Sequence, residues 1–150
     1  MKKKNTKKII YYWLPVGVWA LLIFMFSSMP TGYASEIQWK DFIVKKSAHL
    51  VEFSILAVLL FRLLINSGME KRKAGYWAVF LSVFYAVTDE VHQIFTPGRD
   101  PTVRDIAIDT AGAVFGVYFA GKILPDKKKK EVFKYIYNFV YPKKNIRKGK

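Results

Sequence analysis

The chain has 150 residues, of which 52% are hydrophobic and 17% aromatic, and its 25 Lys and Arg against 11 Asp and Glu give a formal net charge of +14. This length suits a single domain, and so many apolar and aromatic residues exclude a purely disordered basic protein. The absence of cysteine excludes a disulfide scaffold, a thiolate zinc site and a cysteine nucleophile.

Long apolar runs alternate with dense lysine blocks along the chain. A helix needs about 20 mostly apolar residues to cross a hydrocarbon core about 30 Å thick. Residues 9–26 (IIYYWLPVGVWALLIFMF) meet this requirement without a charge. Residues 44–65, 74–95 and 103–124 each join an apolar half to a polar half, and turn-forming Pro and Gly residues separate them. We therefore predict an all-α polytopic membrane protein whose four transmembrane helices lie in residues 1–124.

A cleaved signal peptide is the alternative for the first run. The run has a basic start, and the small residues at Tyr33-Ala34-Ser35 suit a cleavage site. The apolar stretch is longer than a usual signal core, however, and three further candidate spans follow it. These features favour a membrane helix.

The lysines set the orientation of the predicted helices. Most basic residues lie before the first helix, between the second and third, or after Pro125, and few lie on the other side. The positive-inside rule then places both termini in the cytoplasm. Topology and attraction to anionic lipid explain the net charge, so no nucleic-acid partner is needed.

Residues 125–150 form a basic cytoplasmic tail in this interpretation. Within it, residues 131–141 (EVFKYIYNFVY) place apolar side chains on one helical face, with Lys134 and Asn138 opposite. This pattern is typical of a helix that lies in the headgroup region. A solvated, partly disordered tail is the alternative.

The polar residues of the last three helices share one level. The predicted orientation puts the start of the second helix, the end of the third and the start of the fourth at the outer surface. At 1.5 Å per residue, His49 lies about 8 Å deep, Asp89 and Asp109 lie at a similar level, and Glu52 lies about 12 Å deep. Ionisable groups of three helices are therefore expected to meet in the outer half of the bundle.

Each helix also gathers its polar groups on one face. Lys45, His49 and Glu52 follow the spacing i, i+4, i+7, and Asp89 lies four residues before Gln93.

Asp105 and Asp109 share a stripe with Gly112 and Gly116. These two glycines form a G-x-x-x-G pattern, which lets another helix approach closely. The acids are thereby directed into the bundle, and the glycines also offer a contact for an oligomer.

Four motifs, spread over roughly residues 9–122, resemble those of VanZ-like membrane proteins. They are Trp19 with Leu22-Ile23-Phe24 and Ser27-Ser28-Met29-Pro30; Lys46-x-x-His49-x-x-Glu52-Phe53; Asp89-Glu90-x-x-Gln93-x-Phe95-x-Pro97-Gly98-Arg99; and Asp105-x-x-x-Asp109-x-x-Gly112. The resemblance implies a multi-pass protein of the bacterial cytoplasmic membrane, with a role in the cell envelope that is associated with low-level resistance to teicoplanin and related lipoglycopeptides. The tail after Pro125 lies outside the resemblance.

We predict an outward-facing polar pocket that binds or modifies an envelope amphiphile, with membrane lipid, a glycopeptide antibiotic or a cell-wall precursor lipid as partner. Oxygen and imidazole donors also suit a divalent cation, and a carboxylate with a histidine suits acid–base catalysis. The candidate catalytic residues, which would also hold any metal, are His49, Glu52, Asp89, Glu90, Asp105 and Asp109. The candidate ligand-binding residues are Lys45, Lys46, Gln93, Arg99, Ser27 and Ser28.

Three other interpretations remain open at this stage. No motif of a known enzyme chemistry is present, so the pocket could bind an antibiotic or precursor without catalysis. The charged groups could instead form an ion-pair network that only stabilises the fold. A small proton-coupled transporter is less favoured, because such proteins keep their essential acids near the bilayer midplane.

Overall fold

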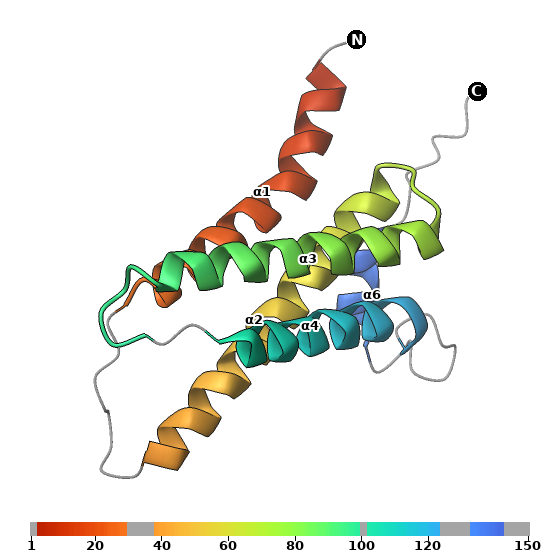
Figure 1. Ribbon diagram of the computed structural model, residues 1–150. Helices are drawn as coiled ribbons and strands as arrows, with labels where there is room; N and C mark the ends of the chain where they lie inside the picture. Colours follow the sequence, from red (N-terminus) through yellow and green to blue (C-terminus); the bar gives the residue numbers. More distant parts are fainter. Residues whose placement is uncertain (1–2, 30–37, 100–101, 124–132, 143–150) are drawn as a thin grey trace, which may run out of the picture.

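The structure is a computed structural model, and it describes residues 3–29, 38–99, 102–123 and 133–142. All regular structure in these ranges is helical, which confirms the predicted all-α class. The elements are α1 (Lys3–Ser27), α2 (Gln38–Asn66), α3 (Lys71–Gln93), α4 (Val103–Tyr118), the π-helical turn η1 (Phe119–Ile123) and α6 (Lys134–Val140). Helix α2 packs against α1, α3 and α4, so it is the central helix of the bundle (Figure 1).

Two helices of the described chain are long and apolar enough to cross a membrane. They are α1 over Ile10–Ser27 and α2 over Lys46–Asn66. Helices α3 and α4 occupy the third and fourth predicted segments, but they are not among the helices that meet this requirement. Helix α4 gives way to η1 after 16 residues. The four-span topology therefore stays a prediction.

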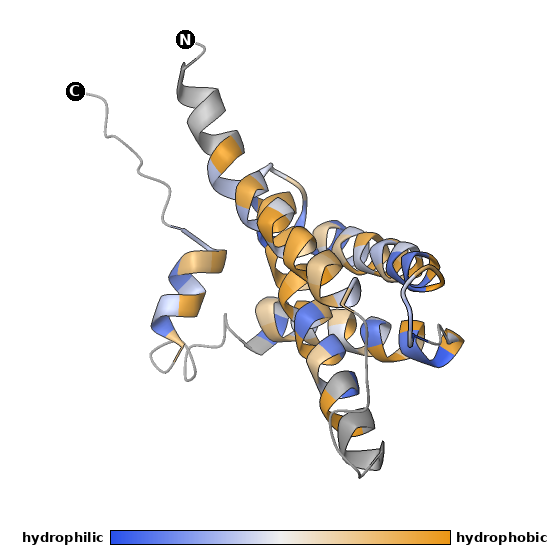
Figure 2. Ribbon diagram, turned by 90° about the vertical axis from the view of Figure 1, so that its left-hand side faces the viewer, coloured by the Kyte–Doolittle hydropathy of each residue, from blue (hydrophilic) through white to orange (hydrophobic). Residues whose placement is uncertain are grey.

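Large apolar side chains cover the outside of the bundle. Leu14 on α1 is 58% exposed, and Phe80 and Phe84 on α3 are 58% and 63% exposed. Figure 2 shows hydrophobic residues along much of the length of α1. Apolar patches of this kind mark surfaces that meet lipid or a partner rather than water.

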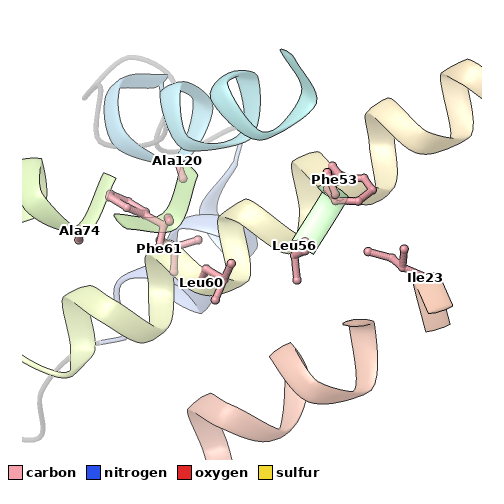
Figure 3. Packing of buried hydrophobic residues seen from close by; sticks show 10 residues of the cluster. Ile23, Phe53, Leu56, Leu60, Phe61, Ala74 and Ala120 are labelled. Carbon is pink, nitrogen blue, oxygen red and sulfur yellow. The ribbon is translucent and has the colours of Figure 1, made fainter. Parts of the chain in front are cut away.

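The buried core is built on α2. Its residues Phe53, Leu56 and Phe61 are almost fully buried. Ile23 of α1 and Ala74 of α3 approach the same core from two sides (Figure 3). The small size of Ala74 lets α3 lie close to α2.

The G-x-x-x-G pattern of α4 packs against α2. A Cβ atom on Gly112 would collide with the carbonyl oxygen of Leu50, and one on Gly116 would collide with that of Ser54. The predicted close approach of another helix is confirmed, but the partner is α2 of the same chain. Both glycines are buried in this contact, so this face of α4 is used within the chain.

Arg62 of α2 is completely buried, although it lies close to the end of the predicted membrane segment 44–65. Its guanidinium carbon lies 4.6 Å and 4.7 Å from the ring centroids of Tyr11 and Tyr12. It lies 4.1 Å from that of Phe139 on α6. Three aromatic faces therefore take the place of water around this charge.

The predicted tail helix is present as the seven-residue α6. The face that we expected to meet headgroups packs largely against the bundle, since Val140 is buried and Phe133 and Tyr137 contact the core. The hydroxyl of Tyr141 donates a hydrogen bond of 2.8 Å to the carbonyl of Ala120. Burial raises the pKa of Tyr141 to about 12, so this donor keeps its proton at any physiological pH.

Candidate functional site

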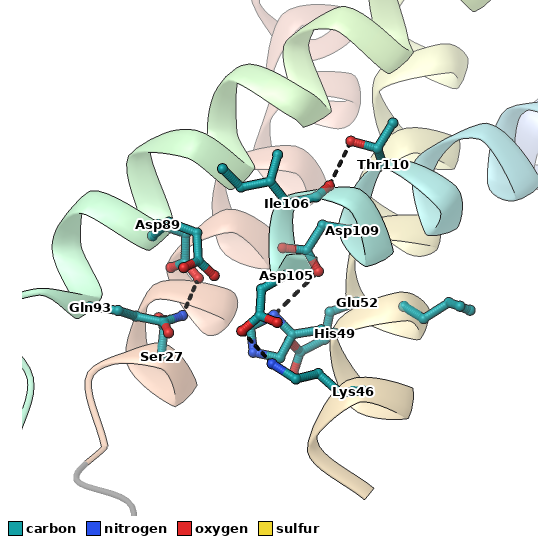
Figure 4. A network of polar contacts seen from close by, with 12 residues as sticks. Ser27, Lys46, His49, Glu52, Asp89, Gln93, Asp105, Ile106, Asp109 and Thr110 are labelled. Carbon is teal, nitrogen blue, oxygen red and sulfur yellow. Dashed lines mark hydrogen bonds and ion pairs between the residues drawn. The ribbon is translucent and has the colours of Figure 1, made fainter. Parts of the chain in front are cut away.

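Segments of four helices meet at one end of the bundle. They are the end of α1, the first half of α2, the end of α3 and the start of α4 (Figure 4). Side chains that are far apart in the sequence lie together there. We call this group the polar cluster, and it comprises Ser27, Lys46, His49, Glu52, Asp89, Gln93, Asp105 and Asp109.

His49 and Asp109 form the deepest pair between α2 and α4. Nδ1 of His49 lies 3.3 Å from Oδ1 of Asp109, and the two side chains are only 12% and 1% exposed. The contact has ion-pair distance but not the alignment of a hydrogen bond. A carboxylate in this position can orient an imidazole and stabilise its protonated form.

A second pair joins the same two helices nearer to their outer ends. Nζ of Lys46 contacts Oδ2 of Asp105, and the two side chains are 21% and 8% exposed. Lys46 lies three residues before His49, and Asp105 lies four residues before Asp109. Helical spacing on both helices thus stacks two acid–base pairs along one face of contact.

Gln93 connects α3 to α1. Its Nε2 donates a hydrogen bond of 2.8 Å to Oγ of Ser27 and another of 2.9 Å to Oδ2 of Asp89. All three side chains are buried, with residue exposures of 2–3%. Gln93 therefore holds both Ser27 and Asp89 in defined positions at the cluster.

Glu90 faces a different neighbour, because one residue along an α-helix corresponds to a rotation of about 100° from Asp89. Its Oε2 accepts a hydrogen bond of 2.9 Å from the backbone N–H of Thr102, the residue that precedes α4. A carboxylate at this point favours the start of α4, because the N-terminus of a helix carries partial positive charge. Glu90 is 5% exposed, so it is buried at the junction of α3 and α4.

Glu52 and Arg99 lie at the edge of the polar cluster. Glu52 is half-buried and lies within electrostatic range of His49 and Asp89. Nη2 of Arg99 donates a hydrogen bond of 3.0 Å to the carbonyl of Phe26, which ties the loop after α3 to the end of α1.

Of the remaining predicted residues, Ser28 lies outside the polar cluster. Ser28 lies 2.9 Å from Nε2 of His92 and also donates to the carbonyl of Phe24, so it serves the outer surface of α1 and α3. The side chain of Lys45 lies outside the described part of the structure.

Buried carboxylate oxygens without a hydrogen-bond partner distinguish this end of the bundle. In the described part of the chain, such oxygens occur on all four of the buried acids. They are Oδ1 of Asp89, Oε1 of Glu90, Oδ1 of Asp105 and both carboxylate oxygens of Asp109, of which Oδ1 lies at ion-pair distance from His49. An unpaired buried acceptor costs about 1–3 kcal/mol, and more when it is charged, so these atoms suit a ligand that brings hydrogen-bond donors.

The metal hypothesis gains no support from this geometry. Among the residues that the structure describes, no three His, Asp or Glu side chains are grouped so that they could hold a metal ion. Lys46 and His49 each contact one of the acids of α4, and Asp89 is bound to Gln93 instead. We therefore assign no metal to the cluster.

Sequence reasoning missed two residues that shape the site. Oγ of Ser54 donates a hydrogen bond of 2.8 Å to the carbonyl of Gly112 and so fixes α2 against α4 directly below the acids. Thr102 places its N–H on Glu90. The glycine pattern indicated a close backbone neighbour but not which one, and a backbone N–H leaves no signal in a sequence.

Comparison with known proteins supports the resemblance described above. A family model described as VanZ/LLP1 matches residues 9–124. Comparison with curated proteins and with solved structures found no match. The matched region includes α1 from residue 9 onward, α2 to α4, η1 and every residue of the polar cluster. With its apolar outer surface and two helices able to cross a membrane, the chain has the features of a membrane protein and belongs to the VanZ/LLP1 family.

Proposed function

We propose that this protein of the VanZ/LLP1 family resides in the bacterial cytoplasmic membrane and contributes to resistance against glycopeptides of the teicoplanin type. It spans the membrane four times with both termini in the cytoplasm, residues 1–124 form the membrane domain, and the polar cluster opens outward. The cluster binds the polar headgroup of an envelope amphiphile, either the antibiotic itself or a cell-wall precursor lipid.

The buried acid oxygens without partners carry this proposal. Oδ1 of Asp89 and Oδ2 of Asp109 are acceptors in a site of low exposure, where an uncompensated charge is expensive. Amino and hydroxyl groups of a sugar or peptide headgroup would supply the donors. Nε of Arg99 is also buried and unpaired within the described residues, and it suits a phosphate or carboxylate on the same ligand.

A catalytic version of the same site is favoured by the His49–Asp109 pair. A carboxylate that holds one ring nitrogen of a histidine leaves the other to exchange a proton with a ligand. In this version His49 is the general base or acid and Asp109 orients it. Turnover of the bound amphiphile distinguishes this version from simple binding.

The test compares teicoplanin susceptibility in a bacterium that expresses wild type or single variants at equal membrane levels. Asp109→Asn and Gln93→Leu are expected to lose the protection that wild type confers. Thr88→Val is the matched control, because Thr88 precedes Asp89 on α3, is exposed and bonds only to the carbonyl of Tyr85 among the described contacts.

A second measurement separates loss of the site from loss of the fold. Purified wild type and Asp109→Asn are compared for thermal stability and for teicoplanin or precursor-lipid binding, and lipid extracts are analysed for a product. Weaker binding by a folded variant supports the proposal, and a product supports the catalytic version. Unchanged susceptibility of both variants at normal membrane levels contradicts the proposal.

A further inference from the structure

A large cleft lies between α3 and α4 at the end of the bundle away from the polar cluster. Its volume is about 960 Å³, and it extends from the first turns of α3 to η1. Gly75 and Gly121 lie along it, and their lack of side chains leaves the space open. A Cβ on Gly121 would meet only the ring of Phe61 at 3.8 Å and the side chain of Lys71 at 3.9 Å.

The interior of the cleft is apolar. Val79 and Val114 lie on its two walls, one on each helix. Tyr76, Phe80 and Tyr118 add aromatic surface, and all three are more than half exposed to the surroundings of the bundle. A peptide inserted here would bury backbone N–H and C=O groups without partners, whereas a hydrocarbon chain has no such groups.

The mouth of the cleft is basic. Lys71, Arg72 and Lys122 lie there, and Glu70 is the only acid among the described residues that line the cleft. Nζ of Lys122 lies 5.4 Å from the ring centroid of Tyr118, and the guanidinium carbon of Arg72 lies 6.0 Å from that of Tyr76. The aromatic rings of the walls therefore hold two of these cations at the entrance.

The backbone at the mouth is itself unusual. Gly121 and Lys122 both belong to η1, where α4 changes to a π-helical turn. Turns of this kind are rare and frequently occur at functional sites. Here the turn presents a position without a side chain to the cleft and a cation to its rim.

We propose that this cleft binds one anionic phospholipid, with an acyl chain between α3 and α4 and the phosphate against Lys71 and Lys122. Basic pockets between membrane helices on the cytoplasmic side recognise such headgroups. The positive-inside count places this end of the bundle in the cytoplasm, where it meets the inner leaflet. The proposal uses none of the residues of the polar cluster, so it stands independently of the proposed resistance function.

Native mass spectrometry of the purified full chain in detergent tests the headgroup requirement. The probes are dioleoylphosphatidylglycerol and dioleoylphosphatidylcholine, which share their acyl chains and differ in net charge. Wild type is expected to bind the anionic lipid roughly 25-fold more tightly, since each of the two lysines near the phosphate contributes about 1 kcal/mol, or roughly fivefold in affinity. Equal binding of the two lipids overturns the proposal.

Two double variants, each with two lysines replaced in one chain, locate the site. Lys71→Gln with Lys122→Gln removes two cations from the mouth, and Lys73→Gln with Lys134→Gln removes the same charge at exposed positions that do not line the cleft. Only the first pair should lose the preference for phosphatidylglycerol. An equal loss in both pairs shows a general charge effect and overturns the assignment.

Filling the cleft provides the last comparison. Gly121→Leu places a side chain in the cleft. Gly17→Leu is the control, because it adds the same side chain on an exposed part of α1, where a Cβ meets nothing within 4 Å. The Gly121→Leu protein should bind phosphatidylglycerol more weakly than the Gly17→Leu protein. The melting temperatures of the two variants should be close to each other. Full lipid retention by a folded Gly121→Leu protein contradicts an acyl chain in this position.

Discussion

Nε of Arg62 on α2 donates a hydrogen bond of 2.7 Å to the carbonyl oxygen of Phe139 on α6. The Phe139 ring packs on the same guanidinium, and Tyr11 of α1 provides a third contact through its ring and its carbonyl oxygen, 3.4 Å from Nη1. One buried cation thus joins the start of the chain, the central helix and the tail. The tail helix is consequently part of the bundle and does not act only as a basic extension.

Replacing this arginine is expected to release α6. Arg62→Lys keeps the charge but loses the planar fork that bonds to Phe139, at a cost of about 1.5–3 kcal/mol for hydrogen bonds of a charged group. Limited trypsin digestion should cut at Lys134 several times faster, and the thermal midpoint in detergent should fall. Arg72→Lys is the control, because Arg72 is exposed. A tail that stays equally protected in Arg62→Lys contradicts the role of this residue.

The glycines of the helix contacts should differ in their tolerance of alanine. Gly112→Ala and Gly116→Ala force a Cβ into the backbone of α2 and should cost about 1–3 kcal/mol or more. Gly75→Ala meets only Cγ1 of Val117 at 3.3 Å and should cost less. The Cβ added by Gly17→Ala has no atom within 4 Å, so this substitution should stabilise α1 slightly, since alanine is the better helix former. Heating followed by fluorescence-detected gel filtration ranks the four variants, and a reversed order would contradict the packing of α4 on α2.

The Lys46–Asp105 pair should show strong coupling. Lys46→Met leaves a buried carboxylate without its cation, and breaking a buried pair costs about 3–5 kcal/mol, less here because Lys46 is 21% exposed. Asp105→Asn in the same chain removes the stranded charge and should restore much of the lost stability. A double-mutant cycle on melting temperatures measures this coupling, and purely additive effects would show that the two side chains act separately.

The natural absence of cysteine makes the topology directly measurable. Phe95→Cys, at a position that is 79% exposed beside the polar cluster, should react with a membrane-impermeant maleimide in intact cells. Lys73→Cys, at the basic end of α3, should react only after the cells are permeabilised. The opposite pattern would place the polar cluster in the cytoplasm and end the proposal that it meets an envelope ligand.

Much of the site was predictable from local spacing. Helical periodicity correctly placed Asp105, Asp109, Gly112 and Gly116 on one face and directed that face toward a neighbouring helix. Asp89 and Gln93, which lie four residues apart, are hydrogen-bonded to each other on one face of α3. These relations depend on a single helix, whose geometry each residue inherits from its position in the chain.

The partners were decided only by the tertiary structure. The relative rotation and depth of two helices decide whether His49 meets Asp109 or Glu52. They also decide whether Gly112 meets α2 or another copy of the chain. Those quantities follow from the packing of all contacts at once, and hydrophobic patterns do not encode them. Arg62 shows the same limit, because the aromatic rings that enclose it belong to α1 and α6, which are both far from it in the sequence. The amino-acid sequence by itself determined the helices and their polar faces, and the tertiary structure decided which faces meet, because helix geometry is local whereas packing is collective.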